Sequence, residues 1–346
     1  MPAERVIGNL NRALHRLLDE DPSLYLLGED VGDPYGGAFK ATRGLSTAHS
    51  ERVLCTPLSE GAIVGAGGGL ALAGDAAIVE IMFGDFIGLA FDQVLNFASK
   101  SVSMYGGHRP MRLVIRCPTG GNRGYGPTHS QSPQKHFIGM PGLALYEMSP
   151  LHDNWAVLRA ALAGGTPAIL FEDKVLYTRR MLADGAEDGK IDDLFRFTLP
   201  AGPLGPARVH LGNAPGTGGP VPADCVLIAP GGMVHRTLDA MRTLLVEDEI
   251  VCELLVPSRT YPVDAAGLAA LVGDAGRVCV IEESTAGGTW GSEVATALHQ
   301  HLWTTLRRPV RLVHSADSII PTAAHLEREV LVQAETIRAA VLEVLA

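Results

Sequence analysis

The sequence predicts an α/β protein of two domains, each a doubly wound, mostly parallel sheet with helices on both faces. Two observations support this. Short apolar runs alternate along the whole chain with longer stretches whose apolar residues recur at helical spacing. In the middle, the 22 residues 201–222 include eleven glycines and prolines, which interrupt the alternation and divide the chain.

The first half begins with an amphipathic helix within residues 1–21, because Val6, Leu10, Leu14, Leu17 and Leu18 share one helical face. Alternating apolar runs and helical stretches follow it. The expected strands are Leu24–Leu27, Val53–Cys55, Ala77–Ile81, Arg112–Arg116 and Ala168–Phe171, and the expected helices are Gly61–Leu72, Phe86–Ser101 and His152–Ala163.

The second half repeats the pattern after the segment rich in glycine and proline. The expected strands are Cys225–Ala229, Val251–Leu255, Arg277–Ile281 and Val310–Val313, and the expected helices are Val234–Leu245, Gly291–Leu302 and Ala334–Leu345. Residues 201–222 are expected to hold no regular structure. The predicted division is a first domain over 1–185, a linker over 186–222 and a second domain over 223–346.

Composition excludes several classes of function. A net charge of -10 argues against nucleic acid or an anionic membrane as partner. The longest apolar run, Ile63–Ala73, is too short to span a bilayer, and the first 21 residues lack a signal-peptide core. The cysteines at 55, 117, 225, 252 and 279 are odd in number and contain no Cys-x-x-Cys pair. We therefore expect a cytoplasmic protein without disulfides or a metal site.

The segment Thr56–Gly61 places a carboxylate, Glu60, where a strand exits into a glycine-rich helix. An acid at the rim of an apolar sheet is what thiamine-diphosphate chemistry requires, because a carboxyl group there bonds the aminopyrimidine ring and promotes proton loss from the thiazolium carbon. The same Ser-Glu pair also suits a simple helix cap. The motif alone leaves both interpretations open.

Three further segments carry candidate residues. Phe86 follows a strand end, where its ring can stack on a heteroaromatic ligand or pack in the core. His129 lies in a glycine-rich loop, 118–133, and suits proton transfer or an oxyanion, although a solvated histidine is equally consistent. Glu29 follows the first strand, where a buried carboxylate or an ordinary turn acid is expected. No Gly-Asp-Gly followed by Asn is present to hold magnesium and diphosphate.

Together these segments resemble the beta subunit of the decarboxylating component of 2-oxo-acid dehydrogenases, in the transketolase-like superfamily. The resemblance is carried by motifs in family order across residues 24–177, with weaker matches at 232–235 and 287–291. The motifs are Gly28–Val31, Gly36–Phe39, Thr56–Glu60, Phe91–Gln93, His129–Pro133, Pro141–Leu143 and Phe171–Lys174. The implied domains are a transketolase-like pyrimidine-binding domain and a transketolase C-terminal-like domain.

The resemblance implies roles for individual residues. Glu60 would bond the aminopyrimidine nitrogen of thiamine diphosphate, with Leu58 beside the cofactor and Phe86 stacked on its ring. His129 would line the entrance and assist the oxyanion or acyl transfer to lipoyl. Glu29 would lie between the two sites of the assembly, where family models place site-to-site proton exchange.

The resemblance also implies partners. An alpha subunit would hold Mg²⁺ and the diphosphate, in an α2β2 heterotetramer that decarboxylates a 2-oxo acid and acylates the lipoyl group of an acyltransferase core. Two departures stand out: the family's Leu-Arg-Thr-Leu-x-Pro appears as Pro257–Pro262 with its arginine displaced, and Asn213–Pro222 resembles an inserted loop.

A potassium site found in many members is in doubt here. The family's Asp and Asn correspond to Gly164 and Thr166, which leaves the carbonyls of Leu113, Ala161 and Leu162 as candidates. Two other functions stay open. One is a split transketolase-like enzyme acting on sugar phosphates, and the other is a non-catalytic scaffold or regulatory relative.

Overall fold

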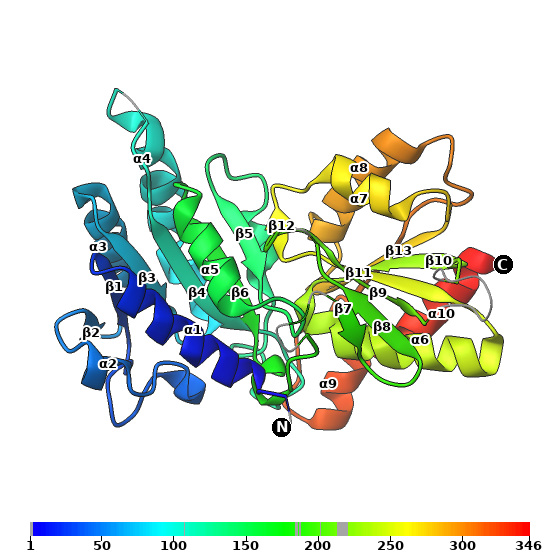
Figure 1. The fold of residues 1–346 in the computed structure, drawn as a ribbon, viewed down its shortest axis with the longest axis horizontal. Helices are drawn as coiled ribbons and strands as arrows, with labels where there is room; N and C mark the ends of the chain where they lie inside the picture. Colours follow the sequence, from blue (N-terminus) through cyan, green and yellow to red (C-terminus); the bar gives the residue numbers. More distant parts are fainter. Residues whose placement is uncertain (1–2, 107, 184–185, 187, 201, 213–220) are drawn as a thin grey trace.

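The computed structural model describes residues 3–106, 108–183, 186, 188–200, 202–212 and 221–346, which form two α/β units placed side by side (Figure 1). Each unit is built on a seven-stranded sheet. The two-domain α/β prediction is therefore confirmed. No helix of the described residues is long and apolar enough to cross a membrane.

The first sheet has the strand order β12-β5-β6-β4-β3-β1-β2, and all of its pairs are parallel except β12 with β5. Consecutive parallel strands need crossover helices, which explains the alternation in the sequence. The strands are β1 (Leu24–Gly28), β2 (Val53–Cys55), β3 (Ala76–Glu80), β4 (Leu113–Thr119), β5 (Ala144–Glu147), β6 (Ala168–Asp173) and β12 (Arg259–Tyr261).

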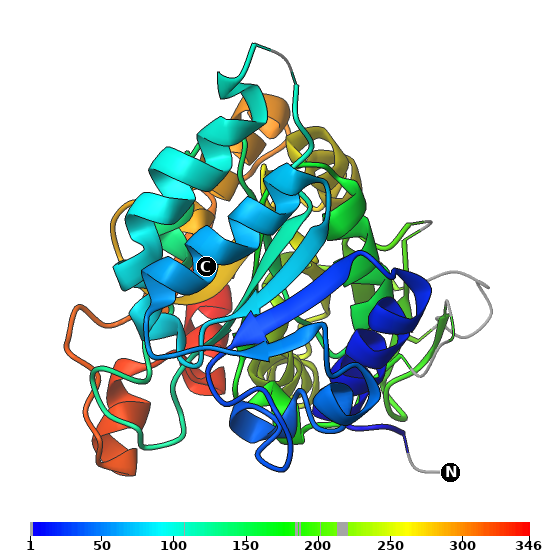
Figure 2. The same ribbon diagram turned by 90° about the vertical axis from the view of Figure 1, so that its left-hand side faces the viewer.

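Helices cover both faces of this sheet. Figure 2 shows α1 (Val6–Glu20) and α5 (Asn154–Ala163) on one face, and α3 (Glu60–Ala73) and α4 (Ser99–Met104) on the other. Each face has its own apolar core. The shorter elements are the helix α2 (Leu45–Ala48), the 3-10 helices η1 (Ala38–Lys40), η2 (Gly84–Ala90), η4 (Pro133–Phe137) and η5 (Leu176–Thr178), and the π-helix η3 (Gln93–Ala98).

The helix predicted over Phe86–Ser101 is present in a modified form. It begins with the 3-10 helix η2, passes through α-helical residues 91–92 and the π-helix η3, and ends as the α-helix α4. Such changes of helical pitch inside one helix are frequent at functional sites. They displace the first turn of this helix relative to a regular α-helix.

The second sheet has the strand order β14-β13-β10-β11-β9-β8-β7, with a parallel core of four strands and an antiparallel edge. Its strands are β7 (Asp188–Lys190), β8 (Phe195–Thr198), β9 (Ala207–Leu211), β10 (Cys225–Ile228), β11 (Cys252–Val256), β13 (Val278–Thr285) and β14 (Arg311–Ser315). Its helical elements are η6 (Gly231–Met233), α6 (Val234–Asp248), α7 (Ala265–Val272), α8 (Trp290–Leu302), α9 (Ala324–Val330) and α10 (Ala334–Leu345).

The prediction of a linker over 186–222 is wrong for its described strands. β7, β8 and β9 come from this segment and pair antiparallel with the second sheet through β11. The cause is local: Phe195 and Phe197 are buried while Arg196 and Thr198 are exposed, the two-residue alternation of a sheet edge. Glycine and proline flank β9 rather than interrupt it. Most of the suspected insertion Asn213–Pro222 lies outside the described residues.

The strand β12 connects the two units. It belongs to the second half of the sequence, yet it pairs with β5 at the edge of the first sheet. Trp290 at the start of α8 donates its indole N–H to the carbonyl oxygen of Thr260 in β12 at 2.9 Å. The displaced family motif Pro257–Pro262 therefore lies at the junction between the units.

Candidate active site

Four neighbouring strands of the first sheet bring the predicted site residues to one edge. Glu29 directly follows β1, Glu60 follows β2 as the first residue of α3, and Phe86 lies in η2 after β3. His129 lies in the loop that follows β4. Because β2, β1, β3 and β4 are adjacent and parallel, their carboxyl ends meet at the crevice where ligands of such sheets bind.

Glu60 is half-buried at the N-terminus of α3. The exposed backbone N–H groups at this end favour a carboxylate. Gly61 makes a close approach possible: an added Cβ would lie 3.2 Å from the Gln93 side-chain oxygen and 3.4 Å from the Leu89 carbonyl oxygen. The first turn of α3 is thus packed directly against the segment that carries Phe86.

Glu29 is buried, with 5% of its surface exposed. Its Oε1 atom has no hydrogen-bond partner among the described residues. Burial raises the pKa of Glu29, and the carboxylates of Glu60, Asp30 and Glu80 raise it further, while a hydrogen bond from the Ser59 backbone N–H opposes the shift. Glu29 is therefore an acid that retains its proton more readily than usual.

Phe86 and His129 are in direct contact, with ring centroids 5.2 Å apart at an interplanar angle of 86°. Phe83 contacts both rings, at 4.8 Å from His129 and 6.4 Å from Phe86. The His129 Nδ1 atom lies 3.0 Å from the Thr128 hydroxyl. The structure thus brings together two residues that the sequence suggested separately. Phe83 is a third member of this aromatic group that sequence reasoning did not single out; its spacing of three residues from Phe86 is the signal that could have found it.

Leu58 differs from these residues because it is 82% exposed. Leu89, across the first turn of α3, is 67% exposed. Ala62, Ala66 and Gly69 continue an exposed, uncharged face along α3. Large apolar side chains at an open edge are typical of a surface that another molecule covers.

Buried polar atoms without a partner gather at the same edge. They belong to residues that either end a strand of the first sheet or lie in the segment that follows its carboxyl end. Within the described part of the chain they are Glu29 Oε1, Thr56 Oγ1, Glu80 Oε1, Asp85 Oδ2, Ser130 Oγ and Lys174 Nζ. Since buried polar atoms are normally paired, such a concentration indicates a place where a ligand supplies the missing partners.

An ion-pair network lies behind the edge. Arg116 in β4 is fully buried and donates from Nε and Nη2 to the two carboxylate oxygens of Glu172, at 2.7 and 2.9 Å, and from Nη1 to Glu80 Oε2 at 2.5 Å. The Tyr177 hydroxyl donates to Glu172 at 2.5 Å. Burial alone would lower the pKa of Arg116, but Glu172 and Glu80 raise it, so the guanidinium stays charged.

This network was not among the features expected from the sequence. Its signal was present: Glu80 and Arg116 are charged residues within otherwise apolar strands. Charged side chains are almost never fully buried unless they are paired. An arginine and a glutamate in neighbouring buried strands therefore predict an internal ion pair.

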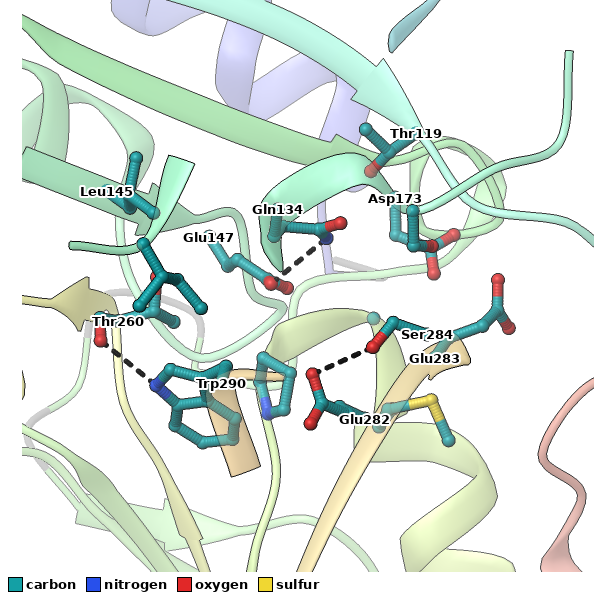
Figure 3. Close-up of a pocket in the computed structure, with 15 residues that line it drawn as sticks. Thr119, Gln134, Leu145, Glu147, Asp173, Thr260, Glu282, Glu283, Ser284 and Trp290 are labelled. Carbon is teal, nitrogen blue, oxygen red and sulfur yellow. Dashed lines mark hydrogen bonds between the residues drawn. The ribbon is translucent and has the colours of Figure 1, made fainter. Parts of the chain in front are cut away.

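A second group of acids, the junction cluster, lies between the two units. A small cavity of about 20 Å³ is lined by Glu147, Asp173, Glu282 and Glu283 (Figure 3). Gln134 donates to Glu147 at 3.1 Å, and Arg236 donates to Glu283 at 2.5 Å. Burial raises the pKa of Glu147 to about 8 and that of Asp173 to about 7.

The positions considered for potassium lie away from the edge. Leu113 begins β4, and Ala161 and Leu162 are in the last turn of α5, at the opposite ends of the strands from Glu60. The Ala161 carbonyl oxygen accepts the Gly164 N–H at 3.3 Å. Across the described ranges, no group of three or more His, Cys, Asp or Glu side chains is arranged to hold a metal ion.

Two protein-family models match the chain. The pyrimidine-binding domain of transketolase matches residues 7–180, and the C-terminal domain of transketolase matches residues 222–337. Among solved structures, a chain described as a split-gene transketolase in an inactive beta4 tetramer superposes with a TM-score of 0.68, at 18% identity and covering 97% of each chain. At that identity the likeness concerns the fold.

Curated relatives match nearly the whole chain. The pyruvate dehydrogenase E1 component subunit beta of Leifsonia xyli is 32% identical over 91% of this chain and 87% of its own length. The acetoin:2,6-dichlorophenolindophenol oxidoreductase subunit beta of Cupriavidus necator is 30% identical, covering 96% and 94%. The 2-oxoisovalerate dehydrogenase subunit beta of Bacillus subtilis is 31% identical, covering 97% of each chain.

Proposed function

Because this chain belongs to the transketolase-like family of E1 beta subunits of 2-oxo-acid dehydrogenases, we propose that it supplies the pyrimidine-binding half of a thiamine-diphosphate site. The observation that carries the proposal is the set of side chains gathered at the carboxyl ends of β2, β1, β3 and β4. Three features lie at adjacent strand ends: Glu60 at a helix N-terminus, Glu29 with its unpartnered Oε1 atom, and the paired rings of Phe86 and His129.

The residues at this edge fit the cofactor. The unpartnered oxygens of Glu29 and Thr56 can bond polar groups of a ligand. The half-buried ring of Phe86 can stack on a heteroaromatic ring of the same ligand. When bound, thiamine diphosphate supplies the nucleophilic carbon and the electron sink for loss of carbon dioxide. Leu58 beside Glu60 would contact the cofactor once its exposed side chain is covered.

Each residue then has a defined task. Glu60 accepts or donates a proton at the aminopyrimidine ring, where its hydrogen bond must offset its own desolvation. Phe86 orients that ring. His129, seated against Phe83 and Phe86, donates a hydrogen bond or proton to a developing oxyanion at the entrance. Glu29 links the site to other acids of the assembly.

The overall reaction we propose is decarboxylation of a 2-oxo acid followed by reductive acylation of lipoyl. Carbon dioxide leaves, the acyl carbon is oxidised, the lipoyl disulfide is reduced, and one of its sulfurs takes the acyl group. An alpha subunit would hold Mg²⁺ and the diphosphate in an α2β2 assembly, and a lipoyl acyltransferase core would receive the product. The exposed Leu58 and Leu89 would contact the alpha subunit.

Co-expression with an alpha chain that carries Gly-Asp-Gly and a downstream Asn tests this function. Calorimetry should show that the pair binds thiamine diphosphate with Mg²⁺, and that the isolated beta chain binds it far more weakly. The pair should release carbon dioxide from pyruvate or a branched-chain 2-oxo acid. Equal binding by the beta chain alone, or turnover of ketose phosphates without lipoyl dependence, would contradict the proposal.

A further inference from the structure

Five ionisable side chains form a row across the first sheet, which we call the charged row. Glu60 follows β2, Glu29 follows β1, Glu80 ends β3, Arg116 lies in β4 and Glu172 in β6. These strands are consecutive neighbours in the sheet. The row therefore runs from the open edge, at Glu60, into the fully buried interior.

Register and packing hold the middle of the row in place. Glu80 pairs with Gly28 on one side and with Arg116 on the other. An added Cβ on Gly28 would lie 3.0 Å from the Glu80 Cβ, and one on Gly37 would lie 3.1 Å from Glu80 Oε1. These glycines let the backbone close around the Glu80 side chain, which is 1% exposed. Its carboxylate consequently has little freedom to move.

The row contains more acids than its single base can neutralise. Arg116 binds Glu172 with two hydrogen bonds and Glu80 with one, while Glu29 has no basic partner among the described residues. An unpaired buried carboxylate is so costly that it takes up a proton instead. Burial without a second base therefore favours the protonated form of at least one of the two acids, Glu29 or Glu80.

We infer that Glu80, fixed by Arg116, is a positioning residue that directs this proton to Glu29 and so presents Glu29 as a hydrogen-bond donor next to Glu60. Arg116 favours the ionised form of Glu80, and that negative charge then favours the neutral form of Glu29. The inference deepens the role proposed above for Glu29. It assigns a function to two residues that touch no ligand in that proposal.

Other charged and polar groups face each acid of the pair. Glu29 faces Glu60 and Asp30, both acids, and receives the Ser59 N–H. Glu80 faces Arg116 and Glu172 and receives the Ala38 N–H. Burial raises the pKa of both acids, and the Glu172 carboxylate raises that of Glu80 further. Arg116 opposes this rise at Glu80 through an ion pair and a hydrogen bond, whereas no cation of the described residues opposes it at Glu29.

The test is a carboxyl titration of the full chain by NMR with ¹³C-labelled glutamate. The Glu29 resonance is assigned by its loss in Glu29→Gln. In Glu80→Gln the midpoint of the Glu29 titration should fall by about one pH unit or more, the effect of removing a nearby charge in a protein interior. Glu147→Gln, which removes a buried acid of the junction cluster, is the matched control and should leave the midpoint unchanged.

An unchanged midpoint in Glu80→Gln would overturn the inference, because glutamine mimics a Glu80 that already carried the proton. Should Glu80→Gln fail to fold, thermal unfolding of Glu29→Gln decides. The unfolding temperature of Glu29→Gln should equal that of the unmodified chain near pH 5 and exceed it by a growing margin as pH rises. A lower unfolding temperature at every pH would contradict the inference. Neither measurement needs turnover, so both are independent of the proposed reaction.

Discussion

The charged row and the junction cluster are two groups of buried acids that the protein treats in opposite ways. In the junction cluster every acid accepts a hydrogen bond from the chain: Glu282 accepts the Gly291 N–H at 2.7 Å, and Glu283 accepts the Gly121 N–H at 2.8 Å. In the charged row Glu29 keeps an unpartnered oxygen, and the edge beside it exposes Leu58.

The difference in hydrogen-bond partners distinguishes a buried acid that stabilises the fold from one that serves a functional site. A carboxylate whose partners are backbone N–H groups of another element ties those elements together, as Glu283 does between the two units. A carboxylate left without partners costs stability, which a fold tolerates where a ligand or neighbouring subunit completes the site.

The largest effect is expected at the open end of the charged row. Glu60→Gln should leave assembly with the alpha subunit intact and lower turnover at least roughly 100-fold, because proton transfer by a positioned carboxyl is typically worth 10² to 10⁴ in rate. Steady-state decarboxylation of the assembled enzyme measures it. Glu51→Gln, a change at an exposed acid that precedes β2, at the opposite end of this strand from Glu60, serves as control. Near-normal turnover would remove Glu60 from the mechanism.

The closed end of the row should govern stability instead. Arg116→Met leaves Glu80 and Glu172 buried without their cation, so the free energy of unfolding should fall by about 3–5 kcal/mol. Denaturant unfolding of the isolated chain measures this. The control is Arg208→Met, which breaks the more exposed pair with Glu253 and should cost less than about 1 kcal/mol. Equal losses in the two variants would refute the distinction.

The junction cluster should respond to pH. Since the folded-state pKa of Glu147 is raised to about 8, above its ordinary value of 4.5, its contribution to stability is fully present below pH 4.5 and is lost as pH rises toward 8. Glu147→Gln should therefore unfold at nearly the same temperature as the unmodified chain at pH 4.5 and at a higher temperature at pH 8. If the difference in unfolding temperature between the variant and the unmodified chain were the same at pH 4.5 and pH 8, Glu147 would be ionised in the folded protein at pH 8.

The smallest effect is expected at the apolar rim. Leu89→Ser removes an exposed side chain, so the stability of the isolated chain should change by less than about 0.5 kcal/mol. Affinity for the alpha subunit should fall about tenfold, as for a well-covered interface residue. Titration calorimetry measures the affinity, with the exposed Trp303→Ser in the second unit as control. An equal loss in both variants would argue against this edge as the contact surface.

Local pattern predicted much of the fold and the chemically distinctive residues of the edge. The helix α1 follows from its five leucine and valine positions, and the strands β1 and β3 from their apolar runs. Glu60, Phe86 and His129 were selected because each follows a strand or lies in a glycine-rich loop. The antiparallel strands β7 to β9 were missed, since the alternation in β8 spans only four residues and the neighbouring segments are rich in glycine, proline and charged residues.

The two-domain α/β class and the candidates at the strand ends follow from local pattern, because helical and strand periodicities are local properties of the chain. Which charges meet depends instead on the three-dimensional fold. Arg116 reaches Glu80 and Glu172 across 36 and 56 residues of sequence because β3, β4 and β6 become neighbours in the sheet. Pairing and burial of charges depend on strand order, and strand order emerges from the packing of the whole domain.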